Sequence, residues 1–252
     1  MMKRVIAGLI VIVLGIFIFT SLYAPKSSEG KFFPEFGKAN LSERVSDKFV
    51  KKNVTGDNGE VVYKETKDPE SGSANMVTSI VVNYRSFDTL GEVTVLFVSA
   101  LGVGLLLSGK SRMKFKTPPN FILKSAVRVI AGVILITGVY IFIHGHLTPG
   151  GGFPGGSMIA SAVLLFYLSD DEFKTKMKSF KLLEGTAGSL YLIFGLLGLA
   201  YGGYFLYNFL PTGTVGELFS AGIVPIIYIF VGLKVGSELS NLISDFLSEE
   251  GK

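Results

Sequence analysis

The feature of this sequence that most constrains its fold is a series of apolar stretches long enough to cross a lipid bilayer as helices. A bilayer core of about 30 Å needs roughly 20 helical residues. The sequence is 48% hydrophobic and 17% charged, against roughly 25% charged residues in soluble domains. We therefore expect an all-α integral membrane protein, multi-pass in the cell membrane. About six transmembrane helices are predicted, near residues 5–23, 76–107, 121–145, 154–169, 186–209 and 216–243.

Three groups of basic residues predict the orientation of these helices. They lie at residues 3–4, 110–116 and 174–181, and with six spans they all fall on one face, which the positive-inside rule makes cytoplasmic. Both termini are then cytoplasmic, and residues 25–73 form one polar exterior loop in which GDNG, at 56–59, suggests a turn or hairpin. The first apolar run, about 19 residues, is longer than a signal peptide needs, so we expect a retained helix.

The remaining composition excludes several classes of function. The net charge of +4 comes from scattered clusters beside apolar runs, not from one basic face, so no nucleic-acid partner is expected. The sequence has no cysteine, which excludes a thiolate metal site and a cysteine-ligated iron–sulfur cluster. We expect no catalytic residue, no bound metal and no cofactor, with Na⁺ or H⁺ as transported ions at most.

The second apolar stretch carries three charged residues where lipid would not tolerate them. Arg85, Asp88 and Glu92 follow the spacing i, i+3, i+7 and form one polar stripe on a helix. Each would cost about 2.5–3.5 kcal/mol at the membrane centre, so the stripe should face protein, water or an ion path. Arg85 can neutralise one acid, and the other is the natural ion-handling group. The alternative is a buried ion-pair cluster that locks the helix to a partner.

The same stretch is too long for one simple span. Its roughly 34 residues would reach about 50 Å as a single helix. We expect a tilt, a projection beyond the membrane, or a break at Gly91 or in the Arg85–Asp88 region. Lys234 and Glu238, one turn apart near the cytoplasmic end of the last span, are a secondary pair that favours a local anchoring bridge.

The segment HGHLTPGGGFPGG, at 144–156, stands between two apolar runs. The span after it is only about 24 Å long, so this segment should dip into the outer part of the bilayer, covered by protein or lining a water-filled cavity. It lacks the lysine of a phosphate-binding loop, and its histidines have no evident third metal ligand. A purely structural turn is the alternative. The candidate outer-mouth residues are His144, Gly145, His146, Pro149, Gly150, Gly151, Gly152, Phe153, Gly155 and Gly156.

Two sets of motifs resemble a known family. GHLTPGGGFPGG and IFVGLKVGSEL resemble the B subunit of Mrp-type multisubunit sodium/proton antiporters over about residues 118–252. The segment VVNYRSFDTLGEVTVLFVSALGV resembles the carboxy-terminal helices of the antiporter A subunit, over about residues 1–110. In archaeal membrane-bound hydrogenases and sulfane reductases those helices form a small separate subunit. We accordingly predict two regions: residues 1–117, with two spans and the polar loop 25–73, and residues 118–252, with four spans.

The resemblance implies a non-catalytic membrane subunit that helps to translocate sodium or protons. Its partners would be other antiporter-type membrane subunits, membrane lipids and, in a redox-driven complex, peripheral redox subunits. The resemblance also implies that Arg85, Asp88 and Glu92 belong to the ion path and that Pro149 and Phe153 matter for transport. A scaffold that joins partner subunits without conducting ions is the alternative, and an autonomous transporter is disfavoured because the spans show no convincing internal repeat.

Overall fold

The computed structural model describes residues 8–17, 45–53, 61–107, 120–169 and 177–247. These residues are almost entirely helical and contain no strand, only an isolated bridge between Lys67 and Thr214, so the all-α prediction is confirmed. The chain divides into two units, residues 1–47 and 48–252. In the first, the apolar helix Gly8–Phe17 lies within the predicted first span. The other residues predicted for that span lie outside the described ranges.

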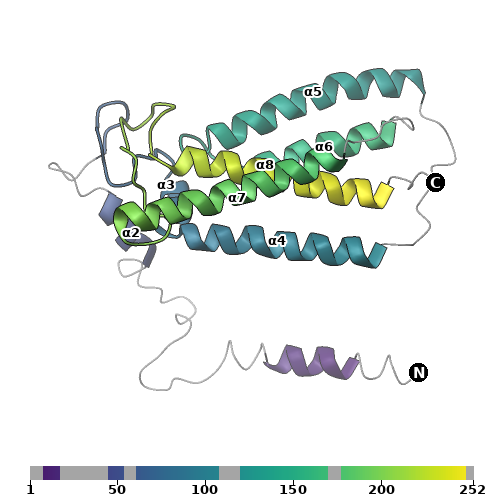
Figure 1. Cartoon of the computed structure of the whole chain (residues 1–252), viewed down its shortest axis with the longest axis horizontal. Coiled ribbons are helices and arrows are strands. Elements are labelled where there is room, and N and C mark those ends of the chain that lie inside the picture. The colour runs from purple at the N-terminus through teal and green to yellow at the C-terminus, as the bar shows by residue number, and fades with distance from the viewer. Residues whose placement is uncertain (1–7, 18–44, 54–60, 108–119, 170–176, 248–252) are drawn as a thin grey trace. The chain divides into compact units, whose positions relative to one another are not determined.

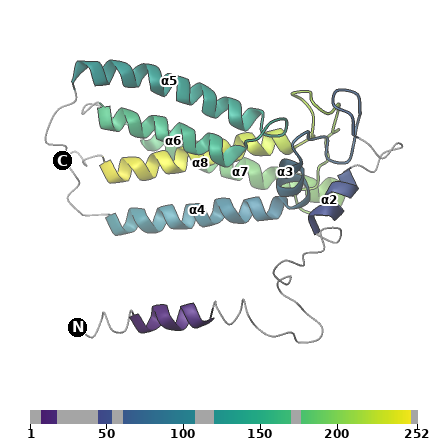
Figure 2. The same cartoon turned by 180° about the vertical axis from the view of Figure 1, so that it is seen from behind.

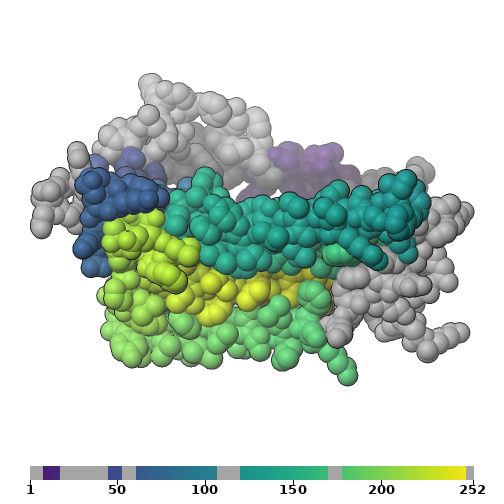
Figure 3. All heavy atoms as spheres, turned by 90° about the horizontal axis from the view of Figure 1, so that it is seen from above, coloured from purple at the N-terminus to yellow at the C-terminus, as the bar shows by residue number. Residues whose placement is uncertain are grey.

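Five helices of the second unit are long and apolar enough to cross a membrane. They are α4 (Ser86–Leu107), α5 (Phe121–Ile143), α6 (Gly152–Ser169), α7 (Met177–Gly202) and α8 (Val224–Leu247). Figures 1 and 2 show them running roughly alongside one another, with their connecting loops at two opposite ends. The most buried of the five is α8, which contacts each of the other four. In the space-filling view, yellow α8 lies between teal α5 and green α7 (Figure 3).

The predicted bounds of the last two spans, 186–209 and 216–243, were wrong. Helix α7 begins at Met177 and ends at Gly202, and α8 begins at Val224. The residues between them leave helical geometry, with positive φ at Gly203, Leu206 and Ala221, among others. Apolar composition alone does not separate this folded loop from the helices that flank it, because the loop also buries apolar side chains such as Leu206 and Ile223.

The long second stretch is broken where the charges begin. A short helix α3 (Met76–Thr78) continues into the π-helix η2 (Ser79–Tyr84), and α4 starts after Arg85, whose φ of −126° ends the helical run. The break therefore falls in the predicted Arg85–Asp88 region, and α4 runs through the alternative site, Gly91. The Tyr191 hydroxyl of α7 donates a 3.0 Å hydrogen bond to the Ser86 carbonyl. This bond holds the start of α4 against α7.

The polar loop is partly helical and binds to the rest of the unit. Helix α2 (Val45–Asn53) occupies the residues before GDNG, so they form no hairpin strand; GDNG itself lies outside the described residues. Further along, the Lys64 amide donates to the Val215 carbonyl and the Asp68 amide to the Gly213 carbonyl, both at 2.8 Å. The described end of the polar loop therefore packs on the α7–α8 loop, far away in sequence.

Candidate functional site

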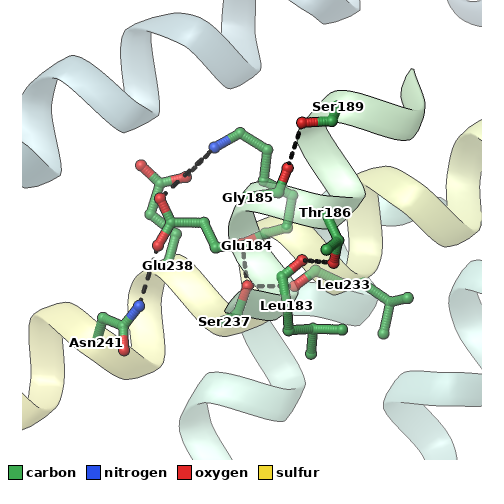
Figure 4. A network of polar contacts seen from close by, with 10 residues as sticks. Leu183, Glu184, Gly185, Thr186, Ser189, Leu233, Ser237, Glu238 and Asn241 are labelled. Carbon is green, nitrogen blue, oxygen red and sulfur yellow. Dashed lines mark hydrogen bonds and ion pairs between the residues drawn. The ribbon is translucent and has the colours of Figure 1, made fainter. Parts of the chain in front are cut away.

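The inner half of α8 carries a stripe of polar side chains. Lys234, Glu238, Asn241 and Asp245 are spaced by four, three and four residues, which places them on one helix face. Helix α7 contributes Glu184 opposite them, as Figure 4 shows for Glu184, Glu238 and Asn241. These two helices pack directly on each other. The stripe is therefore enclosed by protein along the α7 side.

Within this group, one lysine serves two carboxylates. The Lys234 ammonium lies 3.0 Å from Glu238 Oε2 and 3.9 Å from Glu184 Oε1. The Asn241 amide nitrogen donates a 3.0 Å hydrogen bond to Glu184 Oε2. The side chain of Glu238 is only 2% exposed, and those of Lys234 and Glu184 are 12% and 16% exposed. With both acids ionised, the three groups carry one unbalanced negative charge.

The ion pair lies deep along its helix. Glu238 is nine residues from Leu247, where α8 ends, or about 14 Å at 1.5 Å per residue. The sequence placed Lys234 and Glu238 near the end of the last span, and the structure moves them toward its middle because α8 runs from Val224 to Leu247. At this depth Lys234 has little room to reach the interface. Its ammonium instead lies 4.9 Å from the centre of the Phe97 ring of α4.

A cavity of about 470 Å³ lies beside these charges, between α4, α7 and α8. Glu184, Glu238, Asn241 and Asp245 contribute oxygen atoms to its lining, and Lys181 contributes an ammonium. Helix α4 supplies the apolar wall. A side chain at Gly104 of α4 would come within 3.5 Å of Asp245 Oδ2. The cavity therefore places polar groups of α7 and α8 opposite an apolar helix that packs only partly against the bundle.

The stripe predicted as the ion path occupies a different place. Arg85 and Asp88 form an ion pair and remain 59% and 47% exposed, and Glu92 is also exposed on α4. The described residues show no ion pair between this stripe and Lys234, Glu184 or Glu238. Within this chain the stripe faces outward. Arg85 does neutralise one of the two acids, as the spacing suggested.

The glycine segment is irregular backbone covered by polar groups from residues 73–78. The Asn75 side chain donates to the carbonyls of Gly145, at 3.0 Å, and Thr148, at 2.9 Å. The Ser73 hydroxyl donates to the His146 carbonyl at 2.7 Å. These bonds satisfy carbonyls that the end of α5 leaves free. The region before the break and the glycine segment, about 70 residues apart, thus form one polar layer at this end of the bundle.

The glycines allow close packing. A Cβ at Gly145 would lie 2.7 Å from the Tyr228 ring, one at Gly152 would lie 2.6 Å from Val231, and one at Gly156 would lie 2.8 Å from the Gly232 carbonyl. Gly151 is buried beside Tyr228, and Gly155 is buried against α5. Phe153 packs against the main apolar core, whereas Pro149 and Gly150 are exposed.

The two histidines have separate surroundings. His144 stacks on Tyr140, with ring centroids 4.2 Å apart. His146 is fully buried, and neither of its ring nitrogens has a hydrogen-bond partner among the described residues. Burial lowers the pKa of His146, although backbone groups of Glu217 and Leu218 oppose that shift. His146 is thus a neutral core residue beneath the polar layer, which the sequence interpretation had ranked below Pro149 and Phe153.

Sequence reasoning missed Glu184 and Asn241. Glu184 was placed just outside the predicted span 186–209, and the structure puts it in the third turn of α7. Asn241 was not considered, although its spacing from Lys234 and Glu238 was visible in the sequence. The available signal was the four-residue and three-residue repeat of polar side chains along an otherwise apolar helix.

Comparisons with known proteins match two parts of the chain to two families. Residues 122–241 match a domain related to the MnhB subunit of Na⁺/H⁺ antiporters. Residues 37–119 match the family of the MbhE protein of MBH. The two matches cover the segments that carry the glycine motif and the YRSFDTLGE motif.

Individual relatives agree with these families. The chain is 31% identical to protein MJ1307 of Methanocaldococcus jannaschii over 195 residues, which cover 66% of this chain and 74% of that protein. It is 39% identical to the Na⁺/H⁺ antiporter's B subunit in Alkalihalophilus pseudofirmus over 92 residues, 36% of this chain and 60% of that one. A chain of the membrane-bound sulfane sulfur reductase, an archaeal respiratory membrane complex, superposes with a TM-score of 0.69 at 42% identity, covering 99% of this chain and 100% of that chain.

These findings confirm the resemblance inferred from the motifs. The five apolar helices make the chain a multi-pass membrane protein, and the structural match lies in a multisubunit membrane complex, so other membrane subunits are its partners. The relatives named for a function are antiporter subunits. The chain is a membrane subunit of a cation/proton antiporter-type module and belongs to the family of proteins related to the MnhB subunit of Na⁺/H⁺ antiporters.

Proposed function

We propose that this subunit takes part directly in ion translocation, through the cluster formed by Glu184, Lys234 and Glu238. One observation carries the proposal: two carboxylates share a single lysine near the middle of α8, beside a cavity of about 470 Å³. Ionisable groups at such depth are costly and are typical of ion and proton paths in membrane proteins. The cluster itself contributes no chemistry beyond binding and releasing an ion.

The charge count gives the cluster its capacity to bind. One lysine balances one carboxylate, and the second must hold a proton or a cation to avoid an uncompensated charge in a medium of low dielectric constant. A buried ion pair is often no more stable than apolar residues of similar size. Fold stability alone therefore gives little reason for these residues, and reversible binding of one positive charge gives a direct one.

The geometry also provides a means of transfer. The Lys234 ammonium lies between the two acids, at 3.0 Å from Glu238 and 3.9 Å from Glu184. A proton or cation that binds at Glu238 weakens its attraction for Lys234, which then moves toward Glu184. Release from Glu238 restores the first arrangement. This exchange needs only side-chain motion of less than a helical turn.

The outward stripe Arg85, Asp88 and Glu92 has a complementary role in this proposal. Exposed charges on a helix within the membrane region need a protein or water neighbour, and the helix that carries them, α4, is the least buried of the five. We infer that a neighbouring antiporter-type subunit covers the stripe and continues the ion path there. Peripheral redox subunits, where present, and lipids would complete the surroundings.

Two further parts of the proposal concern organisation. The end of the bundle that carries the glycine segment and the α7–α8 loop faces the exterior, as the basic clusters at residues 110–116 and 174–181 predict. The chain comprises an A-subunit-like region, 1–117, and a B-subunit-like region, 118–252. The matches at 37–119 and 122–241 support this division.

Ion flux through the assembled complex in proteoliposomes tests the proposal. We expect Glu238→Gln and Glu184→Gln each to lower sodium and proton flux at least tenfold while the complex assembles normally. Glu217→Gln, an exposed acid in the α7–α8 loop, is the matched control and should leave flux unchanged. Asp88→Asn combined with Glu92→Gln tests the outward stripe in the same vesicles.

The outcome also separates ion handling from a scaffold role. A scaffold predicts that the glutamine variants lose assembly and that any complex which does form conducts at the normal rate. Full flux in assembled complexes carrying both Glu184→Gln and Glu238→Gln would rule out the proposed step.

A further inference from the structure

Two buried oxygen atoms in the cluster have no hydrogen-bond donor. Glu238 Oε1 and Asn241 Oδ1 are both shielded from solvent and without a partner among the described residues. The two residues are 2% and 8% exposed. Leaving a buried acceptor unsatisfied costs about 1–3 kcal/mol and more when it is charged, so native structures rarely keep two of them side by side. Such a pair points to a bound species that the two oxygens share.

The other polar atoms of these two residues are already engaged and fix their orientation. Glu238 Oε2 accepts from Lys234 at 3.0 Å, and the Asn241 amide nitrogen donates to Glu184 Oε2 at 3.0 Å. Reversing the amide would place its oxygen against the Glu184 carboxylate, where two acceptors would repel. The free oxygens are therefore Glu238 Oε1 and Asn241 Oδ1, three residues apart on the cavity-lining face of α8.

The charges around these oxygens favour one positive charge. Lys234 with Glu184 and Glu238 leaves a net charge of −1 when both acids are ionised. The remaining charged residues that line the cavity, Lys181 of α7 and Asp245 of α8, have opposite signs and balance each other, and α4 contributes no charge to the lining. A monovalent cation makes the site neutral, whereas a divalent cation would leave an excess charge beside the Lys234 ammonium.

The ligand types narrow the choice of cation. Carboxylate and amide oxygens suit hard cations rather than soft transition metals. The described residues also contain no group of three or more His, Cys, Asp or Glu side chains arranged to hold a metal ion. Two fixed oxygens next to a cavity leave space for water to complete the coordination of a small ion.

We propose that Glu238 Oε1 and Asn241 Oδ1 form a Na⁺ site, which rests on the proposed role of the cluster in ion translocation and names its cargo. Asn241 supplies the uncharged ligand, and the hydrogen bond to Glu184 orients it. Lys234 competes with the cation for Glu238 and sets how readily the cation leaves. The binding of Na⁺ and the binding of a proton at Glu238 exclude each other.

Binding of ²²Na⁺ to the purified complex, at constant ionic strength with choline chloride, tests this site. We expect Asn241→Leu and Glu238→Gln each to weaken one class of sodium site at least tenfold. Ser240→Ala is the control, because its hydroxyl is buried on the same helix and already donates to the Gly236 carbonyl. If Asn241→Leu fails to assemble, Asn241→Ser, whose hydroxyl is too short to reach the site, replaces it with the same expectation.

The results distinguish this inference from the proposed function. Unchanged sodium binding in both Asn241→Leu and Glu238→Gln would overturn the Na⁺ site, even where Glu238→Gln abolishes flux and so supports a path for protons alone. Weakened binding with undiminished flux in Glu238→Gln would support the site and refute the role in translocation.

Discussion

Replacing Lys234 with methionine removes the only cation that serves two buried carboxylates among the described residues. At an effective dielectric constant of about 20, its attraction to Glu238 at 3.0 Å is about 5.5 kcal/mol and to Glu184 at 3.9 Å about 4 kcal/mol. The cost of desolvating the charges offsets most of this sum. Breaking a buried pair on one side typically costs about 3–5 kcal/mol, because the remaining charge is left uncompensated. We expect Lys234→Met to lower the free energy of unfolding by about that amount.

The matched variant is Lys234→Met combined with Glu238→Gln, which removes the lysine and the most buried acid together. It should recover more than half of the lost stability, because a buried pair exchanged for neutral groups is often tolerated. Unfolding of the full chain in mixed micelles by SDS titration, followed by circular dichroism, measures both changes. A loss below about 1 kcal/mol for Lys234→Met, as for exposed ion pairs, would refute the description of this pair as buried.

Two other predictions concern packing and pH. Gly156→Ala should destabilise the fold by about 1–3 kcal/mol through overpacking, since its Cβ would lie 2.8 Å from the Gly232 carbonyl, whereas Gly132→Ala, with nothing within 4 Å, should be neutral or slightly stabilising in the same titration. Burial lowers the pKa of His146 below its ordinary value of 6.5, so the unfolded chain binds a proton that the folded chain excludes. Stability should be full above pH 6.5 and fall as the pH drops below it. Thermal unfolding at about pH 7.5 and about pH 5.5 should show this slope in the wild type and in His144→Leu but a weaker one in His146→Leu; an equal slope in all three would contradict the assignment.

The helical class and most spans could be predicted because length and apolar composition decide them. Helices α5 and α6 begin and end within two residues of the predicted bounds 121–145 and 154–169. The break at Arg85 was also visible, since the stretch was too long for one helix and carried charges there. In contrast, the end of α7 and the start of α8 depend on the folded loop 203–223, whose apolar side chains are buried by contacts distant in sequence.

The candidate site could be predicted only in part. The Lys234–Glu238 pair followed from i, i+4 spacing, but its partner Glu184 lies on another helix, and spacing within one helix carries no information about that contact. The burial of His146 likewise depends on residues 73–78 and 217–218, which reach it from two distant segments. The role of Arg85, Asp88 and Glu92 depends on a neighbouring subunit and stays a prediction.

The most direct test of the central claim is the flux of sodium through assembled complexes that carry Glu238→Gln, compared with Glu217→Gln in identical proteoliposomes. Our account predicts at least a tenfold loss of flux for Glu238→Gln and none for Glu217→Gln, at equal amounts of assembled complex. Equal flux in the two variants would show that the buried cluster of α7 and α8 is not part of the ion path.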